Sequence, residues 1–208
     1  MFAISKAHVE TTLLTLDILG SACASATVAV LVQGQVQAGG RPLANSAVTL
    51  WAASAGEPKQ LAQARSGSDG RFEFASQDTP GADVVLYLVA KGGEATVNKG
   101  SGDNPAIALL SVLGNTPPST VVVNEMTTVA SVWTHAQFLD GNTIRGNPLG
   151  LGIAAGNVPN FVDLASGGYG VTIQDGLNSG QTPTMANFAT LSSVLAGCVT
   201  QIKPDACS

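Results

Sequence analysis

The sequence predicts an antiparallel β-sandwich over residues 28–113, followed by a mainly α-helical segment over residues 120–208. Three observations support this fold class. Short runs of β-branched and aromatic residues recur through the first half, and turn-forming residues separate them about every 8–12 positions. The adjacent prolines Pro117 and Pro118 mark a linker at 114–119. After this linker the apolar residues recur at helical spacing, which predicts helices instead of strands.

The strands of the first half are predicted from alternating and continuous apolar runs. In the run 47–53, Val48 and Leu50 fall on one face and Trp51 on the other, as expected for a strand with one buried face. The most hydrophobic run, 84–91, is expected to be a central strand of its sheet. The predicted strands are 27–37, 47–53, 61–65, 71–75, 84–91 and 107–113.

In the second half, residues 123–139 are predicted to form a helix capped by Asn124, a residue type favoured at helix N-termini. One stripe of this helix carries Met126, Val129, Ala130, Trp133 and Gln137, of which only the last is polar. This stripe is expected to face the core.

Two further helical regions are predicted after Gly141, which ends the first helix. Residues 147–165 are expected to form a broken helix or separate helical turns, because Gly152, Gly156 and Pro159 interrupt the run. Residues 185–199 are expected to form a final helix capped by Thr184.

Two segments of the first half resemble a known family. Residues 34–50 read G-Q-V-Q-A-G-G-R-P-L-A-N-S-A-V-T-L, and residues 68–74 read S-D-G-R-F-E-F. Together they resemble the carboxypeptidase regulatory-like domain, a transthyretin-like (Ig-like) β-sandwich, over about residues 28–113. The sequence departs from the usual pattern because Gly70 follows Asp69 without a spacer. The resemblance implies an accessory module that acts as a spacer, an adhesion element or a weak carbohydrate-binding surface.

The second half resembles the helical segment of bacterial exported proteins of the propeller type. The residues that carry this likeness are N-E-M-T-T-V-A at 124–130 and the pair Cys198 and Cys207. In larger relatives of this kind a β-propeller can follow the helical segment.

Composition favours an exported β-rich protein over one that binds nucleic acid. Charged residues make up 11% of the chain, against about 25% in typical domains, and the net charge is -5. Binding to phosphates needs clustered Lys and Arg, whereas the basic residues here are scattered. Hydrophobic residues make up 45% of the chain, which is enough for a substantial core.

Residues 1–26 have features of an export signal. An apolar run over 11–26 ends in the small residues Ala24, Ser25 and Ala26, although Glu10 and Asp17 interrupt the apolar pattern. We therefore expect a secreted or cell-envelope protein without a transmembrane span in its mature chain. Lipid attachment at Cys23 remains an open alternative.

Cys198 and Cys207 lie close together in the sequence, and in an exported protein they are expected to form a disulfide bond. Such a bond would close a loop of about ten residues. A zinc site is a weaker interpretation, because no further ligands are evident.

The sequence offers no evident catalytic or cofactor-binding set, so we expect a non-enzymatic protein without cofactor or metal. His8 falls in the signal region, which leaves His135, and no G-x-S-x-G motif is present. We expect His135 to be a surface or core-edge residue near Trp133. Calcium was considered at the scattered aspartates Asp69, Asp78, Asp83 and Asp103, but no D-x-D-x-D-G loop is present.

Trp51 and Tyr87 are the aromatic residues of the predicted sandwich that carry a polar group. Such side chains can stack on a sugar ring, although core packing is the simpler role for each. The expected function is a non-catalytic extracellular or cell-envelope accessory module for adhesion or spacing, with weak carbohydrate binding. Its partner would be a surface polysaccharide or another envelope protein. The alternative is the N-terminal part of a larger exported enzyme or β-propeller protein.

Overall fold

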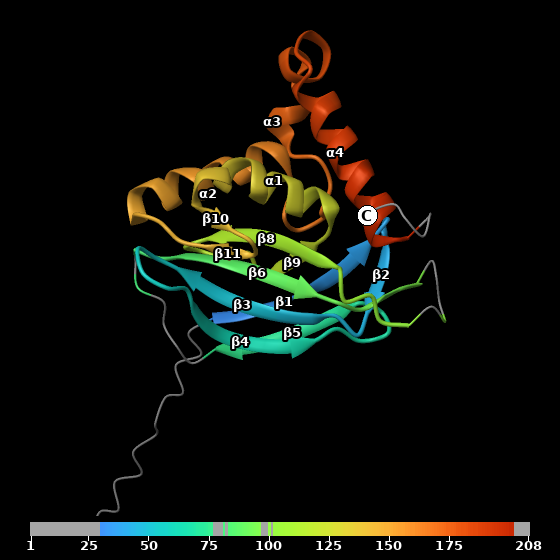
Figure 1. Ribbon diagram of the computed structural model, residues 1–208. Helices are drawn as coiled ribbons and strands as arrows, with labels where there is room; N and C mark the ends of the chain where they lie inside the picture. The colour runs from blue at the N-terminus through green and yellow to red at the C-terminus, as the bar shows by residue number, and fades with distance from the viewer. Residues whose placement is uncertain (1–29, 77–80, 82, 97–99, 101, 202–208) are drawn as a thin grey trace, which may run out of the picture.

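The computed structural model describes residues 30–76, 81, 83–96, 100 and 102–201, and these residues form three layers (Figure 1). Two β-sheets pack face to face, and a layer of helices covers the outer face of the second sheet. The predicted class, a sandwich of largely antiparallel sheets followed by helices, is confirmed. No helix among the described residues is long and apolar enough to cross a membrane.

The first sheet contains five strands in the order β5-β1-β2-β7, with β9 also paired to β1. Only the β1–β9 pairing is parallel, and the other pairings in this sheet are antiparallel. Its strands are β1 (Val30–Ala38), β2 (Arg41–Ala44), β5 (Arg71–Ser76), β7 (Glu94–Ala95) and β9 (Thr120–Val123). The strands β2, β7 and β9 lie outside the predicted strands. Thus the segment predicted as helical begins by adding a strand to the sandwich.

The second sheet is antiparallel, with the order β4-β3-β6-β8. Its strands are β3 (Ala47–Ala53), β4 (Lys59–Arg65), β6 (Val85–Lys91) and β8 (Ala108–Gly114). The predicted central position of the 84–91 run is confirmed, since β6 lies between β3 and β8. Both faces of β6 are buried, which explains its continuous hydrophobic sequence.

The alternation in the strands divides the interior into two cores. Val48 and Leu50 point into the core between the two sheets, together with Phe72 and Phe74 of β5. Trp51 points to the opposite face, as predicted, and the helices cover that face. The second sheet therefore contributes one set of side chains to each core.

The helical layer consists of short elements joined by turns. The helices are α1 (Glu125–His135), α2 (Pro148–Phe161), α3 (Val171–Gln174) and α4 (Thr184–Val199). A 3-10 turn η2 (Ala136–Phe138) leads from α1 into a small hairpin of β10 (Leu139–Asp140) and β11 (Thr143–Ile144), and η3 (Leu177–Gln181) is a π-helical turn. Two predictions were wrong. Residues 148–161 form one continuous helix, in which Pro159 lies near the end, and Thr184 is the first residue of α4 and not its cap.

Helix α1 contacts the second sheet through hydroxyl groups. The backbone N–H of Leu110 donates to Thr128 Oγ1 at 2.9 Å, and the N–H of Val112 donates to Ser131 Oγ at 2.9 Å. Both donors lie on β8, the edge strand of the sheet, where N–H groups would otherwise lack a strand partner. The predicted apolar stripe is therefore only partly buried, and Trp133 is 41% exposed.

The start of α1 is held by the N-E-M-T-T-V-A motif. Asn124 caps the helix as predicted, with its Oδ1 accepting from Thr127 N at 2.9 Å and its Nδ2 donating to Gly167 O at 3.0 Å. Glu125 Oε1 accepts from Gly39 N at 2.7 Å and so connects α1 to the β1–β2 turn. Burial raises the pKa of the Glu125 carboxyl, which this hydrogen bond partly offsets. The motif thus has a structural explanation in this chain.

Cys198 lies near the end of α4, and Cys207 lies outside the described residues, so their bond stays a prediction. Val199, the next residue, packs in the core between the sheets, and Figure 1 shows α4 running from α3 toward β2. A bond between these cysteines would attach the C-terminal segment to the end of α4, which Val199 anchors in the core between the sheets.

We expect reduction of this bond to lower the free energy of unfolding by about 2.5–3 kcal/mol. The reason is that the unfolded chain gains conformational entropy when the closed loop is opened. Urea denaturation with and without reductant measures this difference. The Cys207→Ser variant should match the reduced protein and should no longer respond to reductant. Two free thiols at positions 198 and 207 in the exported protein, detected by alkylation and mass spectrometry, would contradict the prediction.

Candidate functional site

The two aromatic residues predicted to stack on a ligand, Trp51 and Tyr87, are neighbours in the structure. They are paired in register across β3 and β6, and their ring centroids lie 6.5 Å apart with an interplanar angle of 17°. Trp51 is half-buried, whereas Tyr87 is 1% exposed. The structure therefore assigns Tyr87 mainly to the core and leaves part of Trp51 open to solvent.

The strands on either side of this aromatic pair are irregular. The pairing of β3 with β4 shifts between Leu50 and Trp51, and the pairing of β6 with β8 shifts between Leu86 and Tyr87. Such bulges increase local twist and are frequent where a strand redirects a side chain near a site. Here both bulges lie beside the residues that form the aromatic pair.

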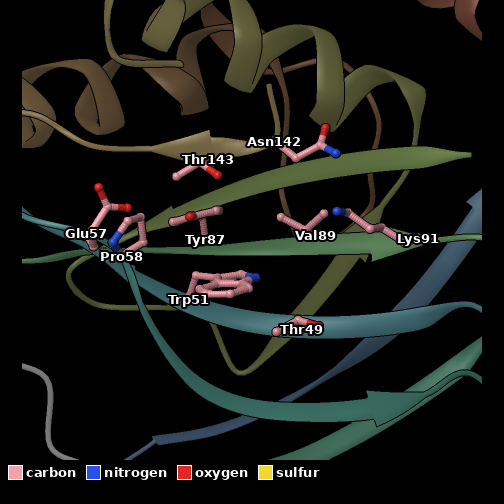
Figure 2. Close-up of a pocket in the computed structure, with 9 residues that line it drawn as sticks. All are labelled: Thr49, Trp51, Glu57, Pro58, Tyr87, Val89, Lys91, Asn142 and Thr143. Atoms are coloured by element: carbon pink, nitrogen blue, oxygen red, sulfur yellow. The ribbon is translucent and has the colours of Figure 1, made fainter. Parts of the chain in front are cut away.

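A pocket of about 270 Å³ opens over these rings on the helix-facing side of the second sheet (Figure 2). In Figure 2, Glu57 and Pro58 lie at one end, Lys91 lies at the other, and Trp51 and Tyr87 lie between them. The remaining lining residues are Thr49, Val89, Asn142 and Thr143. The pocket thus combines an aromatic surface with hydroxyl, amide and charged groups.

The upper wall of the pocket is the β10–β11 hairpin. Its two-residue loop is Gly141 and Asn142, and Gly141 has a φ of 58°, a conformation that glycine adopts readily. Asn142 and Thr143 were not identified from the sequence as site residues. The signal was present in the Gly141-Asn142 pair, because glycine followed by asparagine is typical of a two-residue hairpin loop.

Contacts with the loop between β3 and β4 hold this hairpin over the sheet. The N–H of Gly146 donates to Ser54 O at 2.9 Å, and Arg145 Nη1 donates to Glu57 Oε1 at 2.9 Å. Arg145 Nη2 also lies 3.7 Å from Asp140 Oδ2. The carboxylate of Glu57, which lines the pocket, is therefore compensated by a guanidinium.

Tyr87 joins the floor of the pocket to the hairpin. Its hydroxyl oxygen accepts from the N–H of Ile144 at 3.4 Å, a long hydrogen bond. Burial raises the pKa of the Tyr87 phenol, and the Ile144 hydrogen bond only partly offsets this effect. The phenol is therefore neutral at physiological pH and retains its proton for donation.

His135 does not belong to this pocket, and its predicted surface or core-edge position was wrong. The side chain is fully buried beside Phe138, with ring centroids 6.4 Å apart. Its Nδ1 lies 2.9 Å from Thr134 Oγ1 and 3.2 Å from Ser131 O. Its Nε2 has no hydrogen-bond partner among the described residues.

The aspartates considered for calcium are engaged in turns where the structure describes them. Asp69 Oδ1 accepts from Arg71 N at 3.0 Å, and Asp103 Oδ1 accepts from Gly93 N at 2.5 Å. Asp83 is exposed and lies near a different groove, and Asp78 falls outside the described residues. Within the described ranges, no group of three or more His, Cys, Asp or Glu side chains is placed to hold a metal ion.

A wider groove of about 910 Å³ lies between α2 and the ends of β6 and β8. Its α2 wall carries the exposed side chains of Leu149 and Ile153, with Gly152 between them. Polar residues such as Asp83 and Asn147 also line this groove, but its lining residues include no aromatic side chain. We therefore regard the Trp51 pocket as the candidate ligand site.

Comparison with known proteins yields little. No family model matches the chain, and no curated protein matches its sequence. Among solved structures, a 9R-lipoxygenase from Cyanothece PCC8801 aligns with 14% sequence identity and a TM-score of 0.28. The alignment covers 56% of this chain and 17% of the lipoxygenase chain. A similarity this low carries no argument about fold or function.

Proposed function

We propose that this protein is a non-catalytic accessory module of the cell envelope or extracellular space, which binds carbohydrate weakly through the Trp51 pocket. The observation that carries the proposal is the position of the half-buried Trp51 ring within a concave site. Binding would serve adhesion to a surface polysaccharide or would position a neighbouring domain.

The chemistry of the pocket supports a sugar ligand. A sugar ring has apolar C–H faces and polar hydroxyl edges, so it needs a flat apolar surface flanked by hydrogen-bonding groups. Trp51 supplies the surface, while Thr49, Asn142 and Thr143 supply neutral donors and acceptors around it. The volume of about 270 Å³ lies slightly below the range of about 300–1000 Å³ for drug-sized ligands, which favours a single sugar ring.

Two features of the sequence support the location and the role. The apolar run over 11–26 with its small-residue ending supports export. The resemblance of residues 28–113 to the carboxypeptidase regulatory-like, transthyretin-like domain supports an accessory role rather than an enzymatic one. The two-sheet arrangement is compatible with that resemblance.

Trp51→Ala is expected to weaken binding to a positive oligosaccharide on a glycan array by about tenfold, because the stacking surface is removed. The matched control is Trp133→Ala, which removes the other tryptophan of the chain from an exposed position on α1. This control should bind like the unmodified protein.

Circular dichroism of both variants checks that the fold is intact. The proposal fails if no bacterial or plant oligosaccharide on the array binds the unmodified protein. It also fails if the folded Trp51→Ala variant binds as tightly as the Trp133→Ala variant.

A further inference from the structure

We propose that the pocket selects an acidic sugar residue, a hexuronate, with Trp51 against the ring and Lys91 at the carboxylate. This inference rests on the proposed function and specifies its ligand class. It depends on the distribution of charge around the pocket, which the aromatic pair alone does not determine.

Lys91 is the lining residue whose charge is uncompensated. It is exposed at the end of β6, and Figure 2 shows its amine directed back toward Val89, above the floor of the pocket. In the part of the chain that the structure describes, no carboxylate lies within ion-pair distance of the Lys91 ammonium. An ammonium held beside a ligand pocket can therefore form its ion pair with the ligand.

The opposite end of the pocket does not offer a second free charge. Glu57 is the acidic lining residue, and Arg145 Nη1 lies 2.9 Å from its Oε1. Asp140 lies 3.7 Å from the same guanidinium and does not line the pocket. The site therefore presents one free cation at one end and an internally paired carboxylate at the other, which favours a ligand with one terminal negative charge.

The other groups of the pocket favour a uronate over a different anion. A single lysine acts as a point charge, whereas phosphate sites commonly use several donors or an arginine fork. The aspartate or glutamate side chain of an acidic peptide would pair with Lys91 but would leave the Trp51 ring without a flat partner. A hexuronate uses both features, since its carboxylate lies at the edge of the ring.

The net charge of the whole chain is -5, so the long-range electrostatic field of the protein disfavours the binding of anions in general. Selectivity for a uronate must therefore come from the local ion pair with Lys91. Such a pair is screened by salt at an exposed site, so the preference for the acidic sugar should fall as ionic strength rises.

The test compares methyl β-glucuronide with methyl β-glucoside, which differ in the C6 carboxylate. The chain contains two tryptophans, so Trp133→Phe leaves Trp51 as the sole tryptophan reporter of pocket occupancy. Fluorescence titration of this variant is expected to give about threefold to tenfold tighter binding of the glucuronide at low salt.

Adding Lys91→Met should remove this preference, so that the variant binds the glucuronide no more tightly than the glucoside. Adding Arg41→Met instead, which removes a positive charge from β2 outside the pocket, should leave the preference for the glucuronide unchanged. Equal binding of the two sugars to the Trp133→Phe protein, or a preference that survives Lys91→Met, overturns the inference and leaves the proposed function standing. Failure of both sugars to bind, with no oligosaccharide bound on the array, overturns both.

Discussion

Replacing Gly34 with alanine is expected to lower the free energy of unfolding by about 3 kcal/mol, because the first sheet has no room for a side chain there. Gly34 lies in β1, paired with Phe72 of β5 on one side and with Val121 of β9 on the other. A Cβ atom at this position would overlap the carbonyl oxygen of Val121 and would lie 2.8 Å from Phe72 Cζ. The backbone of β9 would have to move, which would disturb its parallel pairing with β1.

Urea denaturation of the Gly34→Ala variant measures this effect. The control is Gly156→Ala, since Gly156 lies inside α2 with open space around its Cα. Alanine there should raise the free energy of unfolding by about 0.5–1 kcal/mol, because alanine favours helix over glycine. A Gly34→Ala variant as stable as the unmodified protein would show that β9 does not pack against β1 as described.

The second large effect is a loss of folding stability at acidic pH, which we expect from the buried His135. Burial lowers the pKa of His135 from 6.5 to about 4, and the hydrogen bond to Ser131 O offsets only part of this shift. The unfolded chain therefore binds a proton between pH 6.5 and 4 that the folded chain does not bind. Above pH 6.5, His135 is neutral in both states and does not change the free energy of unfolding. As the pH falls from 6.5, the free energy of unfolding decreases, by about 3 kcal/mol at pH 4.

The measurement is the free energy of unfolding at pH 7 and at pH 4, compared between the unmodified protein and His135→Gln. The variant should lose about 3 kcal/mol less stability over this interval, whatever its stability at pH 7. The raised pKa of Glu125 acts in the opposite direction, since protonation in the folded state favours folding as pH falls. Both proteins contain Glu125, so its effect cancels in the comparison. Identical pH dependence of the two proteins would contradict the burial of a neutral His135.

Local periodicity was sufficient to predict much of the sandwich. Val48 and Leu50 alternate with Trp51, and this pattern alone placed them on opposite faces of β3. The run Thr120–Val123 was not identified as a strand, although its β-branched residues favour one. Its parallel pairing with β1, 87 residues earlier, follows from no local pattern.

The burial of α1 could not be predicted from apolar spacing. Its Thr128 and Ser131 hydroxyls accept from the edge strand β8, so polar residues occupy the inner face and Trp133 is left partly exposed. Tertiary hydrogen bonding overrides the apolar stripe in this helix. The same arrangement buries His135 at the end of that inner face, contrary to its predicted position.

The candidate site was predictable only in part. Trp51 and Tyr87 were selected because aromatic residues with polar groups suit a sugar ring, and the pairing of β3 with β6 brings them together. The rest of the pocket comes from Lys91, from Glu57 in a loop, and from a hairpin about 90 residues after Trp51. These groups meet through tertiary contacts such as the Arg145–Glu57 ion pair, which no spacing in the sequence predicts.

The central claim is that ligand binds over Trp51, and amide chemical-shift mapping by NMR tests it most directly. Titration with methyl β-glucuronide is expected to shift the backbone amides of Thr49, Lys91, Asn142 and Thr143 together with the indole N–H of Trp51. Amides of the α2 groove, such as Leu149 and Ile153, should not move. Shifts concentrated in the α2 groove would contradict the claim, and so would no shifts around Trp51 at saturating concentrations of a sugar shown to bind.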